Sequence, residues 1–130
     1  MAGNIKICVV DSSFFLCYLM PDEDSPEVQK IFELYKTGQV KFTAVSLLPF
    51  EVINGLYTAV LRKRIDKALS QKLAEEFLEF PIELKTVDYS QALTLAHKYS
   101  LSVYDASYLT LAQEMNIKLL TLDQKLAKLI

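Results

Sequence analysis

The sequence predicts an α/β fold in which a parallel sheet carries helices on both faces. Short apolar runs of strand length alternate along the chain with longer segments of helical periodicity, and strands separated by helices form parallel sheets. The chain has 130 residues, of which 52% are hydrophobic and 23% charged. That size and composition are typical of one compact core, so we expect residues 1–130 to form a single domain.

Four segments are expected to form strands. The first, residues 5–10, is an apolar run rich in β-branched side chains, which is typical of a strand buried on both faces. The other three expected strands cover residues 40–44, 82–87 and 118–122.

Capping residues mark the expected helices between these strands. Ser25 followed by Pro26 starts a helix that ends at Gly38. Ser46 is expected to cap a long helix that runs to about residue 65, and Asp66 to cap the next helix, which runs to about residue 80. The remaining helices are expected at residues 12–20, 89–99 and 104–115.

Four acidic residues lie where these apolar segments begin or end. They are Asp11 after the first strand, Glu51 in SLLPFEVINGLY, Asp105 in SVYDASYLTLA and Asp123 after IKLLT. In an open α/β sheet, ligands bind beyond the carboxyl ends of the strands, where the strand order reverses. All four carboxylates can therefore converge at one edge of the sheet.

Three of these carboxylates have a simpler interpretation as helix caps. Asp11, Asp105 and Asp123 fall near expected helix N-termini, where Asp is a favoured cap and commonly has no other role. Glu51 is different, because Ser46 already supplies a cap and Glu51 lies in the second turn of an otherwise apolar segment. A capping role does not explain Glu51.

Glu51 belongs to a narrow polar stripe on the long helix. Helical spacing places Glu51 on one face with Asn54, Thr58 and Arg62, while apolar residues cover the rest of the helix. The stripe either meets solvent or faces a specific ligand.

The charge of the whole molecule does not favour nucleic acid. The net charge is −2 and the pI about 5.4, so a phosphate-bearing partner would have to be held locally. The dense basic cluster consists of Arg62, Lys63, Arg64 and Lys67. These side chains either meet solvent near a helix C-terminus, where cations are favoured, or contact phosphate, and Arg62 is the candidate for that contact.

The residue types that the sequence lacks limit its chemistry. His97 is the single histidine and lies in a helical segment far from the acidic residues, so neither a serine hydrolase triad nor a histidine-based ribonuclease is expected. Cys8 and Cys17 lie in apolar surroundings, as buried thiols do. The isolated glycines cannot build a phosphate-binding loop. An all-oxygen cluster remains, which selects Mg²⁺ or Mn²⁺ and supports phosphodiester hydrolysis.

The sequence predicts neither a membrane span nor an export signal. The longest uncharged stretches, such as residues 42–50 and 52–61, are shorter than the roughly 18–20 residues that a span requires. Residues 1–4 lack the basic region of a secretory signal, and Lys6 interrupts the apolar run that follows. We therefore expect a soluble, cytoplasmic protein.

Four segments together resemble the PIN domain family, and most closely its small VapC-type toxins. They are VVDSS at 9–13, PFEVINGL at 49–56, YDASYLTLA at 104–112 and TLD at 121–123. Each segment alone is weakly specific, but the four in this order span nearly the whole chain. The resemblance implies a three-layer α/β/α fold with a central parallel sheet of four to five strands. Because few residues follow Asp123, the final edge strand of many relatives is expected to be short or missing.

The resemblance also assigns roles to individual residues. The acidic quartet, by which we mean Asp11, Glu51, Asp105 and Asp123, matches the family residues that bind Mg²⁺ or Mn²⁺ and cleave RNA. Polar positions that commonly support such a quartet are matched by Ser12, Asn54 and Thr121.

A function and partners follow from the same resemblance. The expected protein is a Mg²⁺-dependent endoribonuclease acting on single-stranded RNA, and it is the toxin of a toxin–antitoxin pair. A homodimer is expected, with an antitoxin that places a basic side chain in the acidic pocket. One alternative is a housekeeping RNA-processing nuclease of the same fold. Another is an inactive module that binds RNA or protein, although the intact quartet argues against it.

Overall fold

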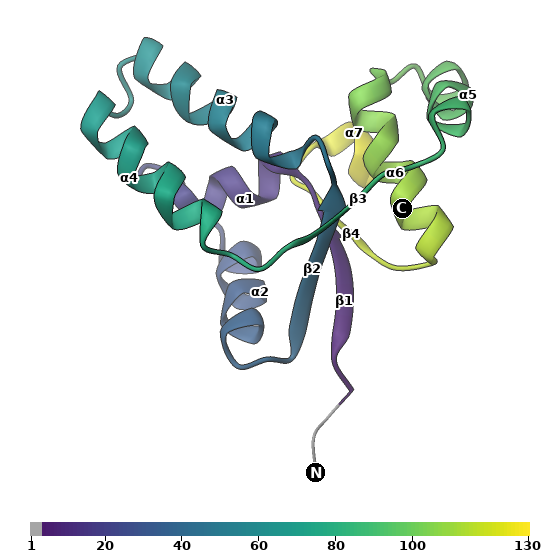
Figure 1. The fold of residues 1–130 in the computed structure, drawn as a ribbon, viewed down its shortest axis with the longest axis horizontal. Coiled ribbons are helices and arrows are strands. Elements are labelled where there is room, and N and C mark those ends of the chain that lie inside the picture. The colour runs from purple at the N-terminus through teal and green to yellow at the C-terminus, as the bar shows by residue number, and fades with distance from the viewer. Residues whose placement is uncertain (1–3) are drawn as a thin grey trace.

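The centre of the molecule is one parallel sheet (Figure 1). The computed structural model describes residues 4–130. In this part of the chain the sheet has the order β3-β2-β1-β4. Its strands are β1 (Lys6–Val10), β2 (Val40–Val45), β3 (Glu83–Lys85) and β4 (Leu119–Leu120). The four expected strands are confirmed, and β3 and β4 are shorter than the sequence predicted.

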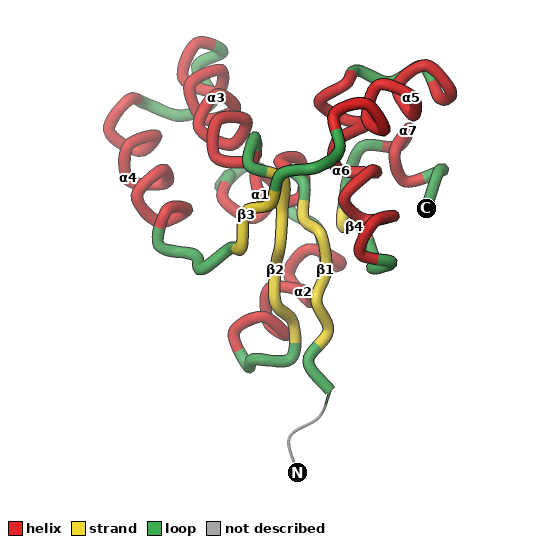
Figure 2. The backbone as a smooth tube through the Cα atoms, turned by 45° about the vertical axis from the view of Figure 1, so that its right-hand side comes forward, coloured by secondary structure: helices red, strands yellow, loops and turns green. Residues whose placement is uncertain are grey.

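Helices cover both faces of the sheet and give three α/β/α layers. The described helices are α1 (Ser12–Leu19), α2 (Pro26–Lys36), α3 (Leu48–Leu61), α4 (Lys67–Leu78), α5 (Tyr89–Tyr99), α6 (Val103–Met115) and α7 (Gln124–Ala127). On one side of the sheet lie α1, α2 and the antiparallel pair α3 and α4 (Figures 1 and 2). On the other side lie α5 and α6. Among the described helices, none is long and apolar enough to cross a membrane.

The strand order reverses at β1. From β1, the strands β2 and β3 extend to one side of the sheet, and β4 lies on the other. Val10 pairs with Leu120 in β4, and the backbone N–H of Asp11 continues this pairing with a 3.1 Å bond to the Leu120 carbonyl. The carboxyl ends of β1 and β4 therefore lie side by side, at the edge where α/β sheets bind ligands.

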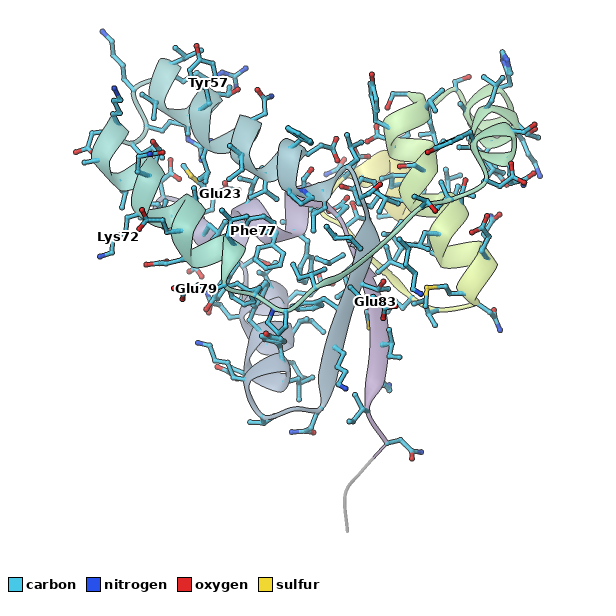
Figure 3. The ribbon with its side chains drawn as sticks, in the orientation of Figure 1. Glu23, Tyr57, Lys72, Phe77, Glu79 and Glu83 are labelled. Carbon is cyan, nitrogen blue, oxygen red and sulfur yellow. The ribbon has the colours of Figure 1, made fainter. Side chains whose placement is uncertain are left out.

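Aromatic side chains hold α1 in place. Phe15 of α1 packs edge-to-face on Phe77 and on Phe80, with 4.9 Å between ring centroids in both pairs. Figure 3 shows Phe77 reaching from α4 into the space between that helix and the sheet. Each such pair adds about 0.5–1.5 kcal/mol to the free energy gained from burial. Because Phe14 and Phe15 are fully buried, the first turn of α1, which Asp11 caps, has a fixed position.

The start of α3 differs from the sequence prediction. Ser46 does not cap this helix; its N-cap is Leu47, whose side chain cannot accept a hydrogen bond from the first turn. Glu51 lies in the first turn and not in the second. The helix dipole favours a carboxylate at that position, so the start of α3 is stabilised by charge where it lacks a polar cap.

The end of α3 also differs from the prediction. The helix ends at Leu61 and does not reach residue 65, because Lys63 adopts a left-handed φ of 60°. The N–H groups of Lys63 and Arg64 donate to the carbonyls of Val60 and Ala59, at 3.0 and 2.9 Å. This pattern is a Schellman motif, which usually has glycine at the left-handed position. A lysine there is the reason that the sequence did not reveal the helix end.

Three other helix starts bear on the predicted caps. Asp66 caps α4 as predicted, and its carboxylate accepts the Leu69 N–H at 2.7 Å. Ser102, and not Asp105, caps α6. After Asp123 the chain forms the short helix α7, so within the described residues the sheet gains no fifth strand.

Candidate active site

Asp11 lies at the carboxyl end of β1 and is the most buried member of the quartet, with 4% of its surface exposed. Its Oδ1 accepts hydrogen bonds from the Phe14 N–H at 3.0 Å and from the Ser13 hydroxyl at 2.7 Å. Its Oδ2 accepts a hydrogen bond from the Thr121 hydroxyl. Asp11 therefore caps α1, and three donors hold its carboxylate in one orientation.

Ser13 and Thr121 join the segment after β1 to the segment after β4. Each hydroxyl donates to Asp11 and also accepts a backbone N–H from the chain after β4, at 2.9 Å for Ser13 and 3.0 Å for Thr121. The sequence analysis placed Thr121 and Ser12 around the quartet. Among the described residues Ser13, and not Ser12, donates to Asp11, because the first turn of α1 directs Ser13 toward β4.

Glu51 receives a hydrogen bond from α6. The hydroxyl of Tyr108 donates to its Oε1 at 2.6 Å. Because Tyr108 is only 1% exposed, this bond fixes α3 against α6 inside the molecule. Tyr108 was not among the residues predicted for the site, since an aromatic residue in an apolar helix is usually a core residue. The available signal was its spacing, because Tyr108 lies three residues after Asp105 and therefore on the same helix face.

Asp105 and Asp123 have different local roles. Ser102 caps α6 by accepting the N–H of Asp105 at 3.0 Å, so the Asp105 carboxylate is not the cap. Asp123 caps α7 by accepting the Leu126 N–H at 3.0 Å. Asp11 and Asp123 therefore cap helices as predicted, and Asp105 does not.

Burial and mutual repulsion raise the pKa values of three members of the quartet. Burial is the largest cause of the raised pKa of Asp11, of Glu51 and of Asp105. The charge of Asp123 further raises the pKa of Asp11 and of Asp105. The charges of Asp105 and Asp11 raise the pKa of Glu51. The four carboxylates therefore act as one cluster of negative charge.

Lys125 is a cation near the quartet that the sequence analysis missed. Its Nζ donates to the carbonyl of Ser100, and its charge lowers the pKa of Asp105. Lys125 lies in α7, the short helix that Asp123 caps, and no pattern in the sequence indicated that its side chain lies near the quartet. His97, in contrast, is exposed on α5, as expected for a histidine on a helix surface.

The ligand chemistry of the quartet fits a hard divalent cation, because every ligand atom that it offers is an oxygen. In the conformation of residues 4–130, no three Asp, Glu, His or Cys side chains are placed to share one ion. The carboxylates of Asp11 and Glu51 are instead turned toward hydroxyl donors of the protein. An ionised carboxylate has about four acceptor sites, so both groups keep acceptor capacity for a cation while they hold these hydrogen bonds.

Two of the predicted residues lie on the exposed surface of α3. Asn54 is exposed, and Arg62 is exposed at the C-terminal end of the helix. Arg62 follows Glu51 by 11 residues, which is about 16 Å along the helix axis. Its neighbour Arg64 forms a 2.8 Å ion pair with Asp22. In the basic cluster, Arg64 therefore ties the turn after α3 to the loop after α1.

Comparison with known proteins agrees with this fold. The PIN domain family model matches residues 8–129. Ribonuclease VapC3 of Pyrobaculum aerophilum is 32% identical to this chain over 124 residues, which cover 92% of this chain and 92% of that protein.

Two crystal structures are similar as well. PAE2754 from Pyrobaculum aerophilum superposes with a TM-score of 0.71 at 20% identity, covering 94% of this chain and 82% of that chain. VapC20 of Mycobacterium tuberculosis, a toxin that cleaves the sarcin–ricin loop, superposes with a TM-score of 0.66 at 14% identity, covering 94% of both chains. At these identities the two structures establish the fold alone. Because the family match and the similarity to VapC3 both span nearly the whole sequence, this chain belongs to the PIN domain family.

Proposed function

We propose that this protein is an endoribonuclease that hydrolyses phosphodiester bonds of single-stranded RNA with the help of Mg²⁺ or Mn²⁺. The observation that carries the proposal is the set of four carboxylates: Asp11 and Asp123 follow β1 and β4 at one edge of the sheet, and burial and neighbouring carboxylates raise the pKa of Asp11, Glu51 and Asp105. The similarity to a ribonuclease over 92% of the chain supports it.

The acidic quartet repels RNA unless its charge is neutralised. Burial and mutual repulsion already disfavour the ionised forms of Asp11, Glu51 and Asp105, as their raised pKa values indicate. A phosphate group brought to the same place adds further negative charge. A divalent cation held by Asp11, Glu51, Asp105 and Asp123 would relieve both repulsions, and it would also lower the pKa of a water that attacks phosphorus.

The surrounding residues position the carboxylates for this work. Thr121 and Ser13 hold Asp11, and Tyr108 holds Glu51. These donors come from α1, α6 and the segment after β4, so the arrangement depends on the packing of the whole fold. Preorganised ligands lose less entropy when a cation and a substrate bind.

We further propose that the protein is the toxin of a toxin–antitoxin pair and acts in the cytoplasm as a homodimer. The names of two similar proteins, VapC3 and the toxin VapC20, support the toxin assignment, while the homodimer and the cytoplasmic location rest on the family resemblance. An antitoxin segment would place an Arg side chain against the quartet, because a guanidinium binds carboxylates in a bidentate manner. Overexpression that leaves growth unaffected, together with failure to co-purify a protein encoded next to its gene, would favour a housekeeping nuclease instead.

Cleavage of single-stranded RNA by a matched pair of variants tests the proposed activity. Glu51→Gln removes one charge of the quartet and keeps the shape of the side chain. Glu75→Gln makes the same change on the exposed surface of α4. We expect Glu51→Gln to lose activity in Mg²⁺ while Glu75→Gln keeps it. Equal activity of the two variants would contradict the assignment of the quartet.

A further inference from the structure

A concave site lies next to the part of α6 that carries Asp105. It is a cavity of about 220 Å³ formed by the ends of β2 and β3 and by the first turns of α5 and α6. Clefts that enclose drug-sized ligands measure about 300–1,000 Å³, so this cavity suits a smaller group such as one planar ring system.

Two helices connect the cavity to the quartet. In α6, Tyr104 and Ser107 line the cavity and flank Asp105 in the sequence. Leu47 also lines the cavity and precedes Glu51 by one helical turn, which is about 6 Å along the axis of α3. A chain molecule bound at the quartet therefore has its neighbouring units within reach of the cavity.

The lining of the cavity has the chemistry that single-stranded nucleic acid requires. The residues Tyr89 and Tyr104 are 78% and 64% exposed, and aromatic faces stack on bases of any sequence. Hydroxyl groups of Ser46 and Thr86 offer donors and acceptors for the edge of a base. Within the described residues, the lining includes Lys85 and no carboxylate. The Nζ of Lys85 forms a 3.0 Å ion pair with Glu83 beside the cavity, so a base meets no cluster of negative charge here, in contrast to the quartet.

We infer that this cavity binds one unstacked nucleobase of the RNA, next to the phosphate that is cleaved. The inference rests on the proposed function and adds a determinant of substrate choice. A base held between Tyr104 and Tyr89 fixes which phosphate lies at the quartet. The hydroxyl groups around it select among bases, and Tyr104 is thereby a specificity residue.

Binding of uncut RNA tests the inference separately from cleavage. The probe is single-stranded RNA with 2-aminopurine at successive positions, whose fluorescence falls when the base stacks. It is titrated with protein carrying Glu51→Gln, so that the RNA remains intact. Tyr104→Ala and Tyr89→Ala should each raise the Kd by roughly 5- to 100-fold and remove the quenching. Tyr104→Phe should retain both properties, because the ring remains.

Tyr57→Ala is the matched control, because Tyr57 is a similarly exposed aromatic residue, 59% exposed, on the outer side of α3 (Figure 3). It should leave the Kd and the quenching unchanged. Unchanged Kd and quenching in Tyr104→Ala would overturn the inference. So would a loss of dimer without a change in RNA binding, which would assign the cavity to a second copy of the chain.

The outcomes also distinguish this inference from the proposed function. Cleavage by the wild-type protein with no effect of Tyr104→Ala on base preference would overturn the inference and leave the ribonuclease intact. If the wild-type protein cuts no RNA but the quenching still depends on Tyr104, base binding in the cavity is supported and the proposed activity is contradicted.

Discussion

The hydroxyl of Tyr108 donates a 2.6 Å hydrogen bond to Oε1 of Glu51 and so joins α6 to α3. Tyr108 is buried, and the pKa of its hydroxyl is raised by burial and by this bond to Glu51. At neutral pH the Tyr108 hydroxyl is therefore protonated and donates to Glu51. In return, the bond lowers the pKa of Glu51 against the effect of burial.

Tyr108→Phe should reduce RNA cleavage by about 10- to 100-fold, the usual cost of removing a group that orients a metal ligand. The pKa of Glu51 should rise without this bond, because the bond lowers it in the wild type. The acidic limb of the pH–rate profile should then move to higher pH, since Glu51 must be ionised to act. Tyr57→Phe, which changes an exposed ring on α3, is the control. Identical pH–rate profiles for Tyr108→Phe and the wild type would show that Tyr108 has only a packing role.

The raised pKa values of the quartet predict how the stability of the metal-free protein depends on pH. Asp11, Glu51 and Asp105 have raised pKa values in the folded state. Between the ordinary and the raised values, the folded protein therefore binds more protons than the unfolded chain. Their contribution to stability is fully present below the ordinary carboxyl values of 3.8 and 4.5 and is lost as the pH rises through the raised values.

Asp105→Asn isolates one of these contributions. Because Ser102 caps α6, the change removes a charge without removing a cap. In EDTA, the free energy of unfolding should fall less steeply with pH for the variant than for the wild type, and at neutral pH the variant should melt at or above the wild-type temperature. Asp66→Asn exchanges one good cap for another at α4 and serves as the control.

Added Mg²⁺ should reverse the order of the two melting temperatures, so that the wild type melts above Asp105→Asn. A ligand that binds only the folded state stabilises it by about 2.7 kcal/mol at 100 times its Kd. The wild type should gain stability in this way as Mg²⁺ is added, and Asp105→Asn should gain much less. If Mg²⁺ shifts the melting curves of both proteins equally, Asp105 is not part of the cation site.

Arg62→Ala should weaken the binding of single-stranded RNA. Arg62 is exposed at the end of α3, and a cation that contacts one phosphate contributes about 0.7 to the slope of log K against log salt. For Arg62→Ala, the slope of log K against log salt should therefore be smaller in magnitude by about 0.7 than for the wild type. Lys72→Ala, on the outer side of α4 (Figure 3), is the control. The same affinity as the wild type at every salt concentration would leave Arg62 without a role in RNA binding.

Lys63→Gly should stabilise the protein by about 0.5–1 kcal/mol. Lys63 has a φ of 60°, a region that costs an L-residue roughly 1–2 kcal/mol and that glycine enters freely. The expected gain in stability is smaller than this backbone cost, because glycine loses more conformational entropy on folding. Lys72→Gly, in the interior of α4, should instead destabilise the protein by about 1 kcal/mol. Urea denaturation of both variants measures the two effects, and a loss of stability in Lys63→Gly would contradict the strain argument.

The sequence predicted most of the fold because strand length and helical periodicity are local signals. It placed Asp11 and Asp123 after parallel strands, and parallel strands end at the same edge of the sheet. The structure puts both residues there, and Asp123 lies close enough to Asp105 for its charge to raise the pKa of Asp105.

The details that the sequence did not predict depend on tertiary packing. Ser12 and Ser13 have the same chemistry, and only the phase of α1 decides that Ser13 reaches Asp11. Tyr108 has the pattern of a core residue, and its partner Glu51 is 57 positions away. Lys63 turns the chain where glycine is usual.

The most direct test of the acidic quartet as a cation-dependent ribonuclease site is the analysis of its cleavage products. Purified protein is incubated with single-stranded RNA in Mg²⁺, in Mn²⁺ and in EDTA, and the ends of the fragments are identified. We predict cleavage with either cation, no cleavage in EDTA, and recovery when Mg²⁺ is restored. The fragments should carry 5′-phosphate and 3′-hydroxyl ends, because an activated water attacks and not the 2′-hydroxyl. Cleavage that persists in EDTA, or 2′,3′-cyclic phosphate ends, would contradict the account.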